Sequence, residues 1–151
     1  MRIIEDDLSG PEIAELLTEH LAAMVRNSPP QCVHALDLAA LRAPDITFWT
    51  AWNKSTLLGC GALKELDPTH GEIKSMRTVD SFLGQGVGSA MLSHLIEIAL
   101  RRSYSRLSLE TGSGPAFAPA LALYEKFGFE YCEPFASYRA DPFTRFMTME
   151  L

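Results

Sequence analysis

The stretch Lys74–Leu92, KSMRTVDSFLGQGVGSAML, decides how the chain folds. An extended run over residues 73–79 forms its first part, and Gly84-Gln85-Gly86-Val87-Gly88 then leads directly into a helical pattern. Glycine lets the backbone approach a ligand closely and adopt dihedral angles that a side chain forbids. The first N–H groups of a helix have no partner within it and lie at the positive end of its dipole. A strand, a glycine turn and a helix start therefore predict an anion cradle, most often for phosphate.

Composition narrows the class of protein. The 151 residues suffice for one domain with a substantial core, and we expect residues 1–151 to form a single domain. The formal net charge of -6 argues against nucleic acid or an anionic membrane as partner, so an anionic ligand needs a local site such as backbone amides. No apolar run approaches the roughly twenty residues that span a bilayer, and the first residues lack the apolar core of a signal peptide. Three widely spaced cysteines in apolar surroundings favour reduced thiols and a cytoplasmic location.

Hydrophobic periodicity gives the order of the elements. Helical spacing predicts a helix over residues 11–26, a second short helix within residues 31–41, one after the glycine loop, and one over residues 117–127. Short apolar or alternating runs predict strands over residues 1–5, 46–52, 57–66, 72–79, 107–109, 129–132 and 146–151. The order βααβββαβαββ indicates one α+β domain with a mixed central β-sheet flanked by helices.

Two familiar phosphate-binding loops fit this sequence poorly. A dinucleotide fold uses G-x-G-x-x-G with an acidic residue about twenty positions later. The spacing here is G-x-G-x-G, although Glu110 falls at a suitable strand end. The loop also lies mid-chain after a hairpin, with too little sequence following it to complete the repeated βα units of that fold. No G-K-[ST] follows the glycines, which argues against an NTPase loop.

Three motifs follow one another at a characteristic spacing. Met76-Arg77-Thr78 precedes Leu83-Gly84-Gln85-Gly86-Val87-Gly88-Ser89, and Leu123-Tyr124-Glu125-Lys126-Phe127-Gly128-Phe129 comes later. Together they resemble the GNAT superfamily of acyl-CoA-dependent N-acyltransferases over nearly the whole chain. The loop is similar to that family's [QR]-x-x-G-x-[GA], and the last segment to its L-Y-x-K-x-G-F. The resemblance implies a single-domain GNAT-like fold and acetyl-CoA as co-substrate.

The resemblance also implies which residues hold acetyl-CoA. The strand carrying Met76, Arg77 and Thr78 runs alongside the pantetheine arm in such proteins. The loop amides cradle the pyrophosphate, from Gly84, Gln85, Gly86, Val87, Gly88 and Ser89. Leu83 stands where the family has glutamine or arginine, so we expect the grip to rest on backbone amides more than on side-chain charge. Phe117 stands where an asparagine often contacts the arm, and that contact is lost or supplied elsewhere, with Ser113 a candidate.

Acetyl transfer from a thioester to an amine sets three chemical requirements. The amine must lose a proton, because an alkylammonium with a pKa near 10 is mostly charged at neutral pH. The oxyanion needs donors, for which we favour backbone amides around Met76–Thr78. The departing thiolate gains from a proton donor, and the resemblance assigns this role to Tyr124, the tyrosine of L-Y-x-K-x-G-F.

Two carboxylates compete for the role of general base. Glu72 opens a strand in a G-E-I-K context that is similar to many relatives with a glutamate there. Alternation along this strand predicts Glu72, Lys74 and Met76 on one face. Glu110 lies at the carboxyl end of the next strand, where ligand sites are common. The sequence does not decide between them.

Other polar residues carry weaker signals. No pair of histidines has the spacing of metal ligands, so we predict no metal, and we expect His34 to be a surface residue. The segment FASYRADPFTRF, with Tyr138, Arg139 and Asp141, has the pattern of a surface loop with a turn, although such a loop often borders the acceptor site in this family.

The sequence thus predicts an acetyl-CoA-dependent N-acetyltransferase that acts by direct attack in a ternary complex. The acceptor is the amine of a small molecule or the amino group of a peptide or protein. Three alternatives stay open: a longer acyl-CoA, an acceptor other than an amine, and a CoA-binding sensor without turnover. A homodimer formed through an edge strand is compatible with the pattern.

Overall fold

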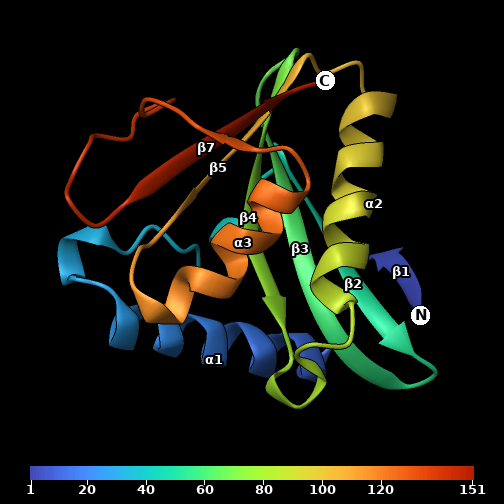
Figure 1. The fold of residues 1–151 in the computed structure, drawn as a ribbon. Coiled ribbons are helices and arrows are strands. Elements are labelled where there is room, and N and C mark those ends of the chain that lie inside the picture. Colours follow the sequence, from blue (N-terminus) through green and yellow to red (C-terminus); the bar gives the residue numbers. More distant parts are fainter.

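The centre of the molecule is a seven-stranded sheet in the order β1-β2-β3-β4-β5-β7-β6, seen in a computed structural model that describes residues 1–151 (Figure 1). Neighbouring strands are antiparallel except β4 and β5, which run parallel and are joined by a helical crossover. This mixed sheet confirms the predicted α+β class. The strands are β1 (Arg2–Glu5), β2 (Ile46–Asn53), β3 (Thr56–Asp67), β4 (His70–Thr78), β5 (Arg106–Thr111), β6 (Glu130–Tyr131) and β7 (Arg145–Glu150).

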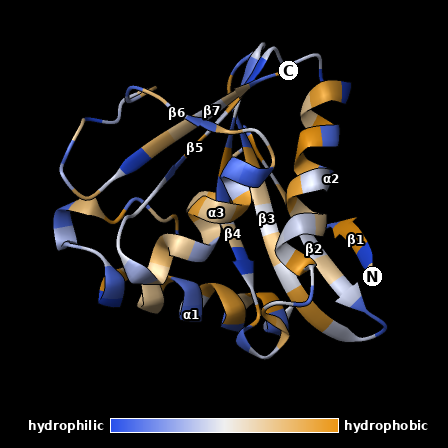
Figure 2. Ribbon diagram, in the orientation of Figure 1, coloured by the Kyte–Doolittle hydropathy of each residue, from blue (hydrophilic) through white to orange (hydrophobic).

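Three α-helices cover the two faces of the sheet: α1 (Pro11–Asn27), α2 (Val87–Arg101) and α3 (Ala118–Lys126). Helices α2 and α3 pack with one face of the strands in the larger core cluster, and α1 packs on the opposite face in a second cluster. Apolar and polar residues alternate along the helices in Figure 2, as expected when one side of a helix lies on a sheet. None of the helices combines the length and apolarity that crossing a membrane requires.

The second short helix predicted within residues 31–41 is wrong. This segment is extended chain between two 3₁₀ turns, Pro30–Cys32 and Ala40–Arg42. Leu36 and Leu38 both pack against the cluster that α1 covers, so the apolar residues reach the core with the period of an extended chain. The other predicted helices and strands are confirmed, with small shifts of their ends.

A β-bulge interrupts β4 in the middle. Cys60 on β3 pairs with Arg77, whereas Ala62, two residues later, pairs with Lys74, so one residue on β3 opposes two on β4. Ser75 lies in the bulge with a φ of 51°, in the left-handed region that residues other than glycine seldom adopt. The bulge therefore resets which side chains of β4 point to each face.

The bulge overturns the predicted common face of Glu72, Lys74 and Met76. Lys74 and Arg77 pair with residues of the α1-side cluster and share that face, and Glu72 contacts Lys74. Met76 instead packs against the core formed with α2 and α3. Simple alternation fails here because the extra residue shifts the pattern by one position.

Strands β4 and β5 separate part of the way along their length. Their pairing begins at His70 and Arg106 and ends at Ile73 and Leu109. Beyond this point β4 continues to Thr78 without a partner on that side, and β5 continues beside β7 alone. The backbone of β4 is therefore available to a ligand where the two strands diverge.

Candidate active site

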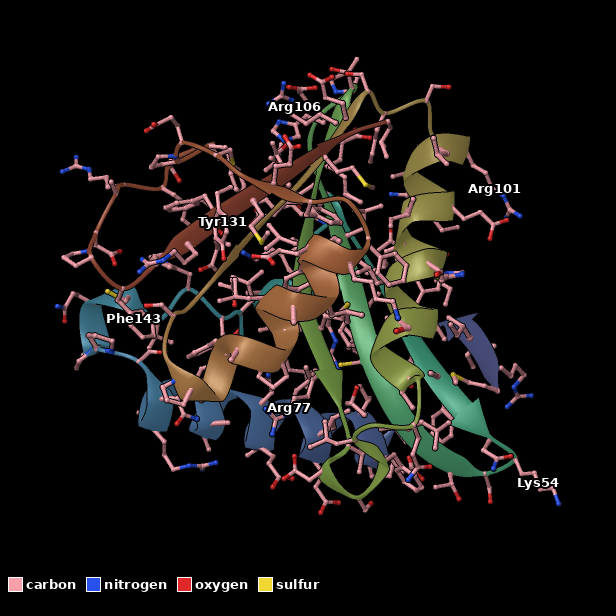
Figure 3. The ribbon with its side chains drawn as sticks, viewed as in Figure 1. Lys54, Arg77, Arg101, Arg106, Tyr131 and Phe143 are labelled. Carbon is pink, nitrogen blue, oxygen red and sulfur yellow. The ribbon has the colours of Figure 1, made fainter.

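A cavity of about 200 Å³ lies where β4 and β5 diverge. Its walls come from the bulged half of β4, the end of β5, the last turns of α1, the segment after α1, and α3. Figure 3 labels Arg77 and Phe143, two residues of this lining, which come from β4 and from the loop before β7. The cavity thus reaches from the side of α3 to the side of α1, through the gap in the sheet.

The glycine loop leads into α2, as the sequence predicted. Gly84 and Gly86 have φ values of 73° and 86°, and an added Cβ at either position meets nothing within 4 Å. The backbone conformation at these two positions, and not a lack of space for a side chain, explains why both are glycine. No hydrogen bond within the protein uses the amides of Gly84, Gln85 or Gly86. The next three amides belong to the first turn of α2, so the loop presents a row of donors at a helix N-terminus that fits a pyrophosphate.

The three sequence motifs meet in space. An added Cβ at Gly88, in the first turn of α2, would lie 3.3 Å from a methyl group of Leu123 on α3 and 3.9 Å from the Thr78 hydroxyl. The start of α2 therefore lies against both the end of β4 and the helix that carries Tyr124. The hydroxyl of Ser113, the candidate replacement for the missing asparagine, donates to the Phe143 carbonyl at 2.6 Å and so has only its acceptor sites free.

Glu110 lines the cavity from the end of β5. No protein group donates a hydrogen bond to its carboxylate. Burial raises the pKa of Glu110 to about 7; the charge of Lys74 opposes this shift and the charge of Glu72 adds to it. A carboxylate with a pKa near neutrality and no partner is suited to accept a proton.

Glu72 is 2% exposed and does not line the cavity. Its Oε2 accepts a hydrogen bond from the Tyr138 hydroxyl at 2.6 Å and lies 3.2 Å from the Lys74 ammonium. Lys74 also donates to the Tyr138 oxygen at 2.8 Å, which closes a network of two buried side chains and the half-buried Tyr138. Glu72 is thus already occupied by partners. Tyr138 lies in the loop between β6 and β7, as the sequence predicted, but it is half-buried and is anchored to β4 by these hydrogen bonds.

Tyr124 is 7% exposed and lines the cavity from α3. Its hydroxyl makes no hydrogen bond to another protein group. Burial raises the pKa of Tyr124 to about 12, and the negative charge of Glu110 contributes to the shift. The hydroxyl therefore stays protonated at neutral pH, as a proton donor requires.

Sequence reasoning missed part of the lining. Five buried polar side-chain atoms in the protein lack a partner, and four of them belong to cavity residues: His20 Nδ1, His34 Nε2, Ser75 Oγ and Arg77 Nε. The prediction of His34 as a surface residue is wrong, because its ring lies 5.1 Å from the Tyr138 ring at the cavity wall. Helical spacing carried a signal for His20, which follows Ile13, Leu16 and Leu17 on the buried face of α1. No group of three or more His, Cys, Asp or Glu side chains is arranged to hold a metal ion.

A sheet that splits beside a glycine-rich helix start is the arrangement expected from the sequence resemblance to acyl-CoA-dependent acyltransferases. The chain belongs to the acetyltransferase (GNAT) family, whose model matches residues 12–129. It is 58% identical to the N-acetyltransferase YsnE of Bacillus subtilis (strain 168) over 151 residues, the whole of both chains.

Solved structures share the fold. A putative acyl-CoA N-acyltransferase from Klebsiella pneumoniae superposes with a TM-score of 0.80 at 25% identity, covering 99% of this chain and 97% of that one. A GNAT family acetyltransferase from Elizabethkingia anophelis, solved with acetyl-CoA bound, gives a TM-score of 0.69 at 21% identity with coverage of 99% and 97%. The family and the relative that matches the whole chain make this protein an N-acetyltransferase, which confirms the predicted family and enzyme class.

Proposed function

We propose that the protein transfers an acetyl group from acetyl-CoA to the amine of a small acceptor by direct attack in a ternary complex. Glu110 acts as the general base and Tyr124 as the general acid. The observation that carries this proposal is that one cavity at the gap between β4 and β5 is lined by both side chains, each without a protein partner. Their pKa values of about 7 and about 12 suit a group that takes a proton and a group that gives one.

The residues around the gap fit acetyl-CoA. Amides of Gly84–Ser89 would hold the pyrophosphate at the start of α2. The backbone of Met76–Thr78 has lost its neighbour β5 and would pair with the extended pantetheine arm, as an exposed strand edge pairs with an added strand. Bound acetyl-CoA supplies the acetyl group as a thioester, whose carbonyl carbon the free amine attacks. Amides beside the bulge would donate to the carbonyl oxygen as negative charge develops on it.

Glu110 and Tyr124 account for each proton that moves in the reaction. Glu110 accepts one proton from the acceptor ammonium, which frees the nitrogen lone pair to form the new C–N bond. As the C–S bond breaks, the Tyr124 hydroxyl donates its proton to the departing sulfur. The second nitrogen proton then restores the Tyr124 hydroxyl, and Glu110 releases its proton to solvent. No covalent bond to the enzyme is formed.

Two alternatives receive less support from this geometry. A longer acyl chain needs space beyond a cavity of about 200 Å³ that must also admit the acceptor. A sensor without turnover has no use for a half-buried carboxylate without a hydrogen-bond partner, because burial penalises the charged form of Glu110 and the nearby charge of Lys74 offsets this cost only in part. Such a costly group is retained most readily where it has a chemical role.

Calorimetry and a thiol-release assay test the proposal together. Acetyl-CoA is titrated into the protein, and free thiol is then measured with acetyl-CoA and a panel of primary amines. We expect binding in the micromolar range typical of enzyme substrates and amine-dependent thiol release. Absence of acetyl-CoA binding contradicts the whole proposal. Binding without turnover on any amine, and with no effect of Tyr124→Phe, supports the sensor instead.

A further inference from the structure

Three of the four cavity residues that carry a buried polar atom without a partner come from α1 and from the bulged part of β4. Nδ1 of His20 comes from α1, Oγ of Ser75 from the bulge, and Nε of Arg77 from the strand immediately after it. His20 is only 7% exposed. Burial lowers the pKa of His20 to about 4, and the positive charge of Arg77 contributes to this shift. The imidazole is therefore neutral at pH 7 and close to the guanidinium.

The outer end of Arg77 is already fixed. Its terminal nitrogen lies 3.1 Å from the Asp80 carboxylate, which is 62% exposed, whereas the Arg77 side chain is only 20% exposed. This contact engages a terminal nitrogen and leaves Nε of Arg77, a residue of the cavity lining, without a partner. Buried donors without partners are rare in native proteins because each loses its hydrogen bond to water. Their presence together in one cavity indicates a ligand that completes them.

The chemistry of these atoms selects the ligand group. A guanidinium N–H and a hydroxyl donate hydrogen bonds, and a neutral imidazole donates from Nδ1 in one of its tautomers. An ionised carboxylate accepts only and has about four lone-pair sites, so it satisfies all three donors and pairs with the charge of Arg77. The ammonium of Lys74, which also lines the cavity, adds positive charge that is shared with Glu72. Glu110 provides the only unpaired negative charge of this lining and suits an ammonium.

We propose that the acceptor is an amine that also carries a carboxylate, such as a free amino acid, with the carboxylate bound by Arg77, His20 and Ser75 and the amine by Glu110. This inference rests on the proposed acetyl transfer. It narrows the acceptor from any amine to a small zwitterion, and it argues against a lysine side chain within a protein, which has no free carboxylate nearby.

Matched pairs of acceptors test this assignment directly. Thiol release from acetyl-CoA is measured with a pool of proteinogenic and small ω-amino acids, and with a second pool of the amines obtained by removing each carboxyl group. We expect kcat/KM to be roughly tenfold to hundredfold higher for the acids, as charge-assisted hydrogen bonds predict. Equal or faster turnover of the decarboxylated amines overturns the inference and leaves the proposed function intact. Turnover of neither pool, with acetyl-CoA bound, also overturns it. Failure to bind acetyl-CoA contradicts both.

Two variants extend the comparison. Arg77→Gln removes the charge and keeps the backbone, so the preference for acids is expected to fall about tenfold while the affinity for acetyl-CoA, measured by calorimetry, stays within about threefold. Arg106→Gln is the matched control, since Arg106 is 46% exposed at the start of β5 and lies outside the cavity. An unchanged acid preference in Arg77→Gln contradicts the assignment. If Arg77→Gln does not fold, His20→Gln takes its place with the same expectation.

Discussion

Ile73 of β4 and Leu109 of β5 are the last residues that pair across the two parallel strands. The residues that follow each of them on the cavity side, Lys74 and Glu110, line the gap that opens there. The end of the β4–β5 pairing thus creates both the opening in which we propose that acetyl-CoA binds and the position of the carboxylate that we propose as the base.

Replacing Tyr124 by phenylalanine tests the proposed acid. We expect kcat to fall about 100-fold, because a positioned proton donor contributes on the order of 10² to 10⁴ in rate. The affinity for acetyl-CoA is expected to stay within about threefold, because backbone amides would form most of the grip. Tyr131→Phe, at a tyrosine that is 55% exposed, serves as the control and is expected to change nothing. A Tyr124→Phe enzyme with at least half of the normal kcat contradicts this role.

The glycine loop is tested by comparing Gly86→Ala with Gln85→Ala. Gly86 has a φ of 86°, and a left-handed conformation costs a residue with a Cβ about 1–2 kcal/mol. Strain of this size in the cradle is expected to raise the Kd for acetyl-CoA about tenfold. The Gln85 side chain is exposed, with one 3.5 Å contact to the Ser81 carbonyl, and its loss is expected to change Kd less than about threefold. Equal effects of the two substitutions would indicate a grip by side chains.

The buried network around Glu72 is expected to stabilise the fold. Glu72→Gln leaves Lys74 without its counter-charge, and breaking such a pair typically costs about 3–5 kcal/mol in the free energy of unfolding. Tyr138→Phe removes the hydroxyl between them and is expected to cost about 1–3 kcal/mol. Urea unfolding of both single variants and the double variant measures their coupling. Additive effects would show that the two side chains do not act as one network.

Glu110 is expected to lower stability at the pH where the enzyme works. Its pKa is raised from the usual value of 4.5 to about 7 in the folded protein, so folding favours the protonated form. The contribution of Glu110 is fully present below pH 4.5, falls as pH rises towards 7, and is lost above it. Glu110→Gln is therefore expected to gain on the order of 3 kcal/mol over wild type above pH 7 and little below pH 4.5. A stability difference that does not change with pH would show that Glu110 titrates normally.

The order of the helices and strands was predictable, because glycines at turns and the spacing of apolar residues are local signals. The extended conformation of residues 31–41 was not predictable, because Leu36 and Leu38 reach the core from a chain whose path depends on tertiary packing. The motifs also singled out Tyr124, which lies in the lining of the cavity.

The acceptor side was much less accessible to sequence reasoning. The bulge at Ser75 has no signature in the letters around it, yet it moves Met76 to the face opposite Glu72. The contact that occupies Glu72 comes from Tyr138, 66 residues further along the chain. Sequence reasoning cannot see such long-range pairing, and for this reason it left the choice between Glu72 and Glu110 open.

The pH dependence of kcat/KM in wild type, Glu110→Gln and Glu72→Gln tests the central claim most directly. With Glu110 as the base, the wild-type rate rises with pH through about 7 as the carboxylate loses its proton. Glu110→Gln is expected to lose this step and about 100-fold in rate, whereas Glu72→Gln, assayed where it is folded, keeps the step. A Glu110→Gln enzyme that retains both the rate and the step near pH 7 would contradict the account.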